Sequence, residues 1–160
     1  MRRYFVLEPE IPGHLGEGTE LDHSVWPPRV RRLVYEFYGW RGDELLESFP
    51  AFIVTADLGA RLEVAALTGF ELSDVEVTTT EDFRESLPEV TLPPFRRLEV
   101  TGIAGEADLG MTSKGQLVVS ERAFDVLRAG RLNHAIVKDF DLSSAPGRDK
   151  GTVPKAPKLN

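Results

Sequence analysis

Apolar residues in this chain fall into short runs that alternate with polar residues and are bounded by Gly, Pro, Asp, Asn or Ser. Such runs are typical of strands with one buried face. In the run around Tyr35, for example, Leu33, Tyr35 and Phe37 fall on one face. The pattern predicts strands over 4–7, 29–37, 52–55, 70–78, 95–101, 117–120 and 135–140.

A different spacing, close to 3.6 residues, marks the helices. It predicts two main helices, over 56–67 and 121–128. Thr55 and Ser120 directly precede them, and their hydroxyl groups can cap the first turn. Acidic residues at the start, and a Thr79–Asp82 spacing typical of a capping box, predict shorter helices over 42–49 and 79–86.

The two main helices belong to an internal echo. Residues 52–55, followed by a helix and a strand, match residues 117–120 at an offset of 65, and Leu62 then falls on Leu127. Two explanations stay open at the level of sequence. The echo is either a true duplication, or a strand, cap and amphipathic helix that arose twice because this arrangement is common.

These elements predict one α+β domain over 1–140. We expect a mixed, mostly antiparallel sheet of about six or seven strands with two main helices on one face. Residues 8–28 predict a long loop of the kind that often carries function. Residues 141–160 combine small residues, prolines and cations without apolar spacing, which predicts a disordered or loosely docked basic tail.

Composition and charge narrow the function classes. The chain has no cysteine, which excludes disulfides and thiol chemistry. Residues 1–140 hold 15 Lys and Arg against 24 Asp and Glu. This acidic body disfavours nucleic acid, suits a basic partner, and also keeps a small domain soluble. The apolar run 4–7 is too short for a signal peptide, and no run approaches the length of a membrane span. We therefore expect a cytoplasmic protein without membrane contact.

The residues of catalysis and metal binding form no recognisable motif. His14 and His23 share a loop with carboxylates, but no regular spacing presents them jointly, so we predict no metal and no cofactor. No serine lies in a nucleophile elbow, and no glycine-rich segment forms a phosphate loop. We predict no catalytic residue. Pairs of carboxylates are abundant, which leaves open a small enzyme that acts on a soluble metabolite.

Two features favour a docking surface instead. The acidic segment 71–89 contains a single arginine, Arg84, and predicts an electrostatic surface for a basic partner. Trp40 and Asp43, beside other aromatics, predict a second patch. The residues predicted to bind on the acidic segment are Glu71, Asp74, Glu76, Glu81, Asp82 and Glu85.

The chain also resembles a loosely defined set of uncharacterised bacterial proteins, some of which are similar to the immunity proteins encoded beside polymorphic toxins. The segments that carry this resemblance are 4–10 (YFVLEPE), 40–46 (WRGDELL), 49–55 (FPAFIVT) and 117–121 (LVVSE). The resemblance covers most of residues 1–140 and implies a cytosolic antidote that binds and blocks a basic toxin domain by occlusion. It brings no functional residues with it. A structural subunit of a homodimer is the third alternative.

Overall fold

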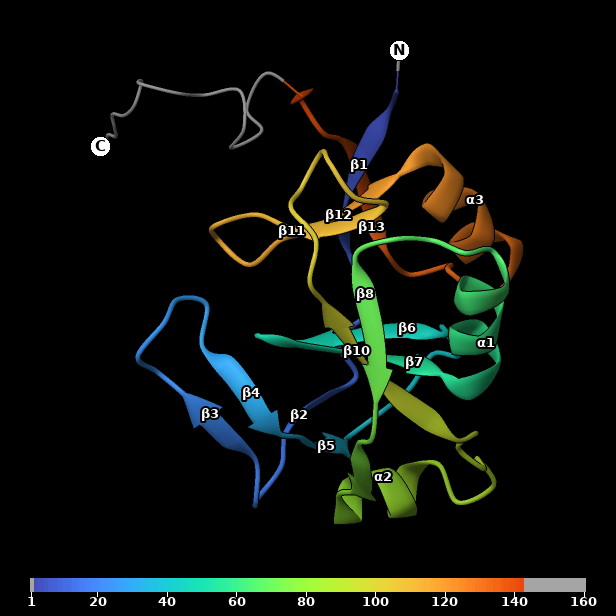
Figure 1. Ribbon diagram of the computed structural model, residues 1–160. Helices are drawn as coiled ribbons and strands as arrows, with labels where there is room; N and C mark the ends of the chain where they lie inside the picture. The colour runs from blue at the N-terminus through green and yellow to red at the C-terminus, as the bar shows by residue number, and fades with distance from the viewer. Residues whose placement is uncertain (1, 143–160) are drawn as a thin grey trace.

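Two four-stranded antiparallel sheets form the framework of the structure, a computed structural model that describes residues 2–142 (Figure 1). The first sheet has the order β6-β7-β10-β8, with bounds Leu45–Ser48, Ala51–Thr55, Phe95–Val100 and Phe70–Ser73. The second has the order β11-β12-β1-β13, with bounds Leu109–Met111, Leu117–Ser120, Tyr4–Glu8 and Ile136–Asp139.

The internal echo of the sequence is present in the pairing of these strands. β7 leads into α1 (Ala56–Val64) and β12 into α3 (Glu121–Ala129), and the hydroxyl groups of Thr55 and Ser120 cap the two helices. Leu98 of β10 pairs with Phe52 and Leu72, whereas Leu7 of β1 pairs with Leu117 and Val137. Phe52 and Leu117 are 65 positions apart, as are Leu72 and Val137. We call β6-β7-α1-β8 the first repeat and β11-β12-α3-β13 the second repeat.

In each of the two sheets, three strands come from one repeat and the fourth comes from another part of the chain. β10 lies between β7 and β8, and β1 lies between β12 and β13. β10 directly precedes the second repeat in sequence, yet it completes the sheet of the first. β1 precedes the first repeat, yet it completes the sheet of the second. This exchange of strands ties the two repeats into one unit.

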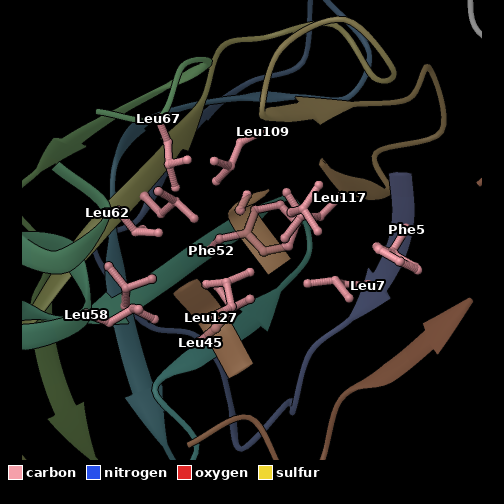
Figure 2. Packing of buried hydrophobic residues seen from close by; sticks show 14 residues of the cluster. Phe5, Leu7, Leu45, Phe52, Leu58, Leu62, Leu67, Leu109, Leu117 and Leu127 are labelled. Atoms are coloured by element: carbon pink, nitrogen blue, oxygen red, sulfur yellow. The ribbon is translucent and has the colours of Figure 1, made fainter. Parts of the chain in front are cut away.

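The main core lies where the two repeats meet. α1 and α3 contact each other and lie on one side of the molecule (Figure 1). Leu58 and Leu62 of α1 and Leu127 of α3 are buried among residues from both sheets (Figure 2). Burying side chains of this size stabilises the fold by about 1.5–3 kcal/mol each. The prediction of two main helices on one face is confirmed.

A second core covers the other face of the first sheet. Tyr35 and Phe37 are buried there, with Phe83 and Phe95 against the Phe37 ring. The elements around it are a three-stranded sheet, a two-stranded arm and a short helix. Their bounds are β2 Gly13–Leu15, β5 Val34–Phe37 and β9 Glu76–Thr79; β3 Glu20–Asp22 and β4 Arg29–Arg32; and α2 Glu81–Ser86. β5 and β9 pair in parallel.

The α+β class predicted from the sequence is confirmed, but the described residues form thirteen strands in four sheets instead of six or seven in one. The predicted helix over 42–49 is wrong, because this segment forms β6. Leu45 and Leu46 enter the two opposite cores, so β6 is apolar on both faces and shows no alternation. Most of the predicted tail, 143–160, lies outside the described residues.

Two predicted strands each divide into two. The segment 29–37 forms β4 and β5, and the segment 70–78 forms β8 and β9, because the two parts of each pair with different sheets. The predicted loop 8–28 contains β2 and β3, and β11 lies between the predicted strands 95–101 and 117–120. The cap of α2 is Thr80, one position after the predicted Thr79.

Candidate functional site

The six acidic residues predicted to bind a partner are all exposed. They follow one another along β8, the β8–β9 connection, β9 and α2, a path that runs towards α2 in Figure 1. We call this set the acidic surface: Glu71, Asp74, Glu76, Glu81, Asp82 and Glu85.

Arginines flank part of this acidic surface, since Arg31, Arg32 and Arg97 line a cleft together with Asp74 and Glu76, but few of the carboxylates are in ion pairs. Glu76 pairs with Arg32 at 2.8 Å, and it is the one member of the set in an ion pair within residues 2–142. Arg84, which lies among these residues, donates to the Thr79 carbonyl and hydroxyl oxygens instead. The dipole of α2 favours Glu81 and Asp82 in its first turn. Glu71, Asp74 and Glu85 form no ion pair with another part of residues 2–142.

The two residues of the second predicted patch differ in exposure: Trp40 lines a cleft of about 500 Å³, whereas Asp43 does not reach the surface. Asp43 is fully buried, and its carboxylate accepts hydrogen bonds from the backbone N–H groups of Asn133 at 2.9 Å and His134 at 2.8 Å. Trp40 is half-buried, and its Nε1 donates to the Asp43 carbonyl oxygen at 2.9 Å. The prediction for Asp43 is therefore wrong, because its carboxylate joins two loops inside the protein and cannot reach a partner.

A buried carboxylate that sequence reasoning missed holds the first repeat together. Glu44 is 8% exposed and accepts hydrogen bonds from the Thr55 hydroxyl at 3.1 Å, the Arg61 guanidinium at 2.7 Å and the Arg131 N–H at 3.1 Å. Burial acts to raise the pKa of Glu44, but the hydrogen bonds and the charge of Arg61 outweigh it and lower the pKa below its ordinary value. We call Glu44 the first hub.

Asp108 occupies the same place in the second repeat. It accepts hydrogen bonds from the Ser120 hydroxyl at 2.8 Å, the Arg122 guanidinium at 3.1 Å and the Thr68 N–H at 2.9 Å. Burial again opposes ionisation, and the three donors again lower the pKa below its ordinary value. We call Asp108 the second hub. Both hubs are explained by structure, so neither is a candidate catalytic group.

One carboxyl group has the opposite behaviour. Burial, and secondarily the nearby charge of Glu8, raise the pKa of Glu47 from 4.5 to about 7.

A cleft of about 500 Å³ is lined by Glu8, Glu10, Arg41 and His134, among others. Glu10 in that cleft accepts a hydrogen bond from the Arg41 N–H at 2.7 Å, and its carboxylate thereby anchors the loop before β6. Glu8 in the same cleft pairs with Lys138 at 3.4 Å, so both acids of the cleft have structural partners.

The structure also shows an exposed tryptophan that sequence reasoning missed. Trp26 is 70% exposed and lies between β3 and β4. The sequence signal that could have identified Trp26 is its position: it precedes Pro27 in the segment 8–28, a long connection of the kind that often carries function.

No model of a known protein family matches the chain, and no curated protein is significantly similar to it. Within residues 2–142, no group of three or more His, Cys, Asp or Glu side chains is placed to hold a metal ion. The same residues contain no helix that is long and apolar enough to span a membrane.

Proposed function

We propose that this chain is a binding protein of the immunity type, which neutralises a cognate bacterial toxin by occluding it through the acidic surface. The observation that carries the proposal is the charge of this surface. Six exposed carboxylates lie on consecutive elements, and one of them, Glu76, forms an ion pair, with Arg32, within the described residues. Like charges in such proximity repel one another, and a basic partner relieves that repulsion.

The first test is the neighbouring gene. The proposal requires a secreted toxin to be encoded directly beside this chain, and its absence contradicts the proposal. The second test is protection: cells that express the toxin domain should grow only when this chain is expressed with it.

Charge reversal tests the surface itself. Asp74→Lys combined with Glu85→Lys changes two exposed carboxylates that form no ion pair, and we expect it to reduce protection and slow association by about tenfold. The matched control is Glu63→Lys combined with Glu106→Lys, which reverses two exposed carboxylates elsewhere. Equal effects of the two double variants, or none from the first, contradict docking at the acidic surface.

A further inference from the structure

An exposed aromatic ridge lies near the acidic surface. Trp26 is 70% exposed, and Val25 and Phe49 are 42% and 41% exposed. The ring centroids of Trp26 and Phe49 are 5.6 Å apart. We call Val25, Trp26 and Phe49 the aromatic ridge. Tryptophan is the residue type most enriched in the binding hot spots of protein interfaces, because it buries a large apolar area with few rotatable bonds.

A cleft of about 450 Å³ opens beside this ridge. Val25 and Trp26 line it together with Pro28, Pro50, Arg97 and Glu99. Proline rings have little conformational freedom to lose, so a partner that enters this cleft meets an apolar wall that is already formed.

Hydrogen bonds hold the loop that presents Trp26. Asp22, at the end of β3, accepts from the Ser24 N–H at 2.9 Å, the Ser24 hydroxyl at 2.6 Å and Arg31 at 2.9 Å. These donors lower the pKa of Asp22 to about 2, so its carboxylate stays ionised across the neutral range. The ridge is therefore positioned before a partner arrives.

Charges of both signs line the cleft, Arg29 and Arg97 against Glu99, and two carboxylates meet at its edge. Glu99 lines the cleft and lies directly opposite Glu71 of the acidic surface in the pairing of β10 with β8. Like charges at opposed positions destabilise a sheet. Arg97 is 3.6 Å from Glu99, but its guanidinium also donates to the Val30 carbonyl oxygen at 2.8 Å. The cleft is continuous with the acidic surface through Glu99.

We propose that this cleft anchors the protein partner: it takes an apolar or aromatic side chain against Trp26, and a flanking lysine or arginine reaches Glu99 and Glu71. This anchor rests on the proposed function and divides the binding of the partner into two tasks, encounter and affinity. The acidic surface accelerates encounter, whereas the aromatic ridge supplies most of the affinity. Arg29 also lines the cleft, and it opposes the incoming cation.

A probe that needs no toxin tests the cleft directly. The chain has two tryptophans, and the Nε1–H of Trp40 is held by Asp43, so the two indole signals in ¹H–¹⁵N spectra report separately on Trp26 and on an internal control. The titrants are the blocked peptides acetyl-Lys-Phe-Lys-amide and acetyl-Glu-Phe-Glu-amide. We expect the basic peptide to shift the Trp26 signal at millimolar concentration, the acidic peptide to leave it in place, and Trp40 to stay unchanged.

Variants sharpen this titration. Glu71→Gln with Glu99→Gln should raise the Kd of the basic peptide about fivefold, and Arg29→Gln should lower it about twofold. Val64→Ala, at a residue of α1 that is 87% exposed, should have no effect. A Trp26 signal that neither peptide shifts, or that the acidic peptide shifts more strongly, overturns the inference.

The complex with the neighbouring toxin provides the second readout. Trp26→Ala should raise the Kd of that complex roughly 30-fold or more, mainly through faster dissociation, while Trp26→Phe retains part of the affinity. The two failures are distinguishable. If the wild-type chain does not protect cells from the neighbouring toxin, the proposed function is refuted. If the wild-type chain protects but Trp26→Ala binds the toxin with the same Kd as the wild type, the anchor is refuted.

Discussion

The two repeats share a framework and differ in what is inserted into it. In the first repeat, residues 9–44 separate β1 from β6 and contain β2 to β5. In the second, the corresponding connection from β10 to β11 is the short segment 101–108. β9 and α2 are likewise added after β8. The aromatic ridge and most of the acidic surface belong to these additions or border them, so the shared positions hold the fold and the unshared positions carry the surface chemistry.

The hubs show how closely the shared positions correspond. The backbone N–H of Thr55 donates to the Glu44 carbonyl at 2.9 Å, and that of Ser120 donates to the Asp108 carbonyl at 2.8 Å. The exchange of strands extends to the hubs, because the loop after α1 contacts Asp108 and the loop after α3 contacts Glu44. Each hub therefore joins one repeat to the other.

The largest expected effect comes from removing the hubs. Glu44→Ala removes the acceptor of the Arg131 N–H and of the buried Thr55 hydroxyl, and we expect a loss of about 3 kcal/mol in the free energy of unfolding. Asp108→Ala should cost about 2 kcal/mol, because its side chain is more exposed than that of Glu44. Urea unfolding measures both values. A cost below 0.5 kcal/mol for either variant contradicts its role as a hub.

A smaller expected effect is a pH dependence of stability that comes from Glu47 in the first repeat and has no counterpart in the second. In the pairing of β6 with β7 and of β11 with β12, Glu47 corresponds to Met111. The pKa of Glu47 is raised from 4.5 to about 7, so the folded state holds a proton that the unfolded state releases. The contribution of Glu47 to stability is therefore fully present below pH 4.5 and is lost as the pH rises through 7.

Glu47→Met copies the second repeat and removes this dependence. We expect a gain of about 1–2 kcal/mol at pH 8, after allowance for the partial exposure of the side chain, and a smaller gain at pH 5. Chemical denaturation at the two pH values measures the difference. An equal change at both would show that Glu47 titrates normally in the folded protein.

The helix caps should show the smallest difference between repeats. Thr55→Ala and Ser120→Ala each remove a hydroxyl that accepts from the third residue of its helix and donates to its hub. We expect a cost of about 1–2 kcal/mol for each, equal within 0.5 kcal/mol on the scale of such caps. Thermal unfolding of both variants is the measurement. A markedly unequal pair would weaken the equivalence of the repeats.

Local signals account for what the sequence predicted correctly. Strands 52–55 and 117–120, their caps and the two main helices follow from short spacings, and the exposure of the acidic segment follows from its charge. The hubs depend on contacts that no local pattern contains. Glu44 and Arg131, for example, are 87 positions apart. β6 was predicted wrongly for a related reason, because two separate cores bury its opposite faces and erase the alternation that identifies a strand.

The central claim, that a basic protein docks on the additions to the first repeat, is tested most directly by the salt dependence of association. The rate constant for binding the neighbouring toxin domain is measured by stopped flow between 50 and 500 mM NaCl. The wild type should associate about tenfold more slowly at the higher salt concentration, and the Asp74→Lys, Glu85→Lys variant should show a much flatter dependence. A wild-type rate that does not change with salt, or a variant with the same dependence as the wild type, contradicts the claim.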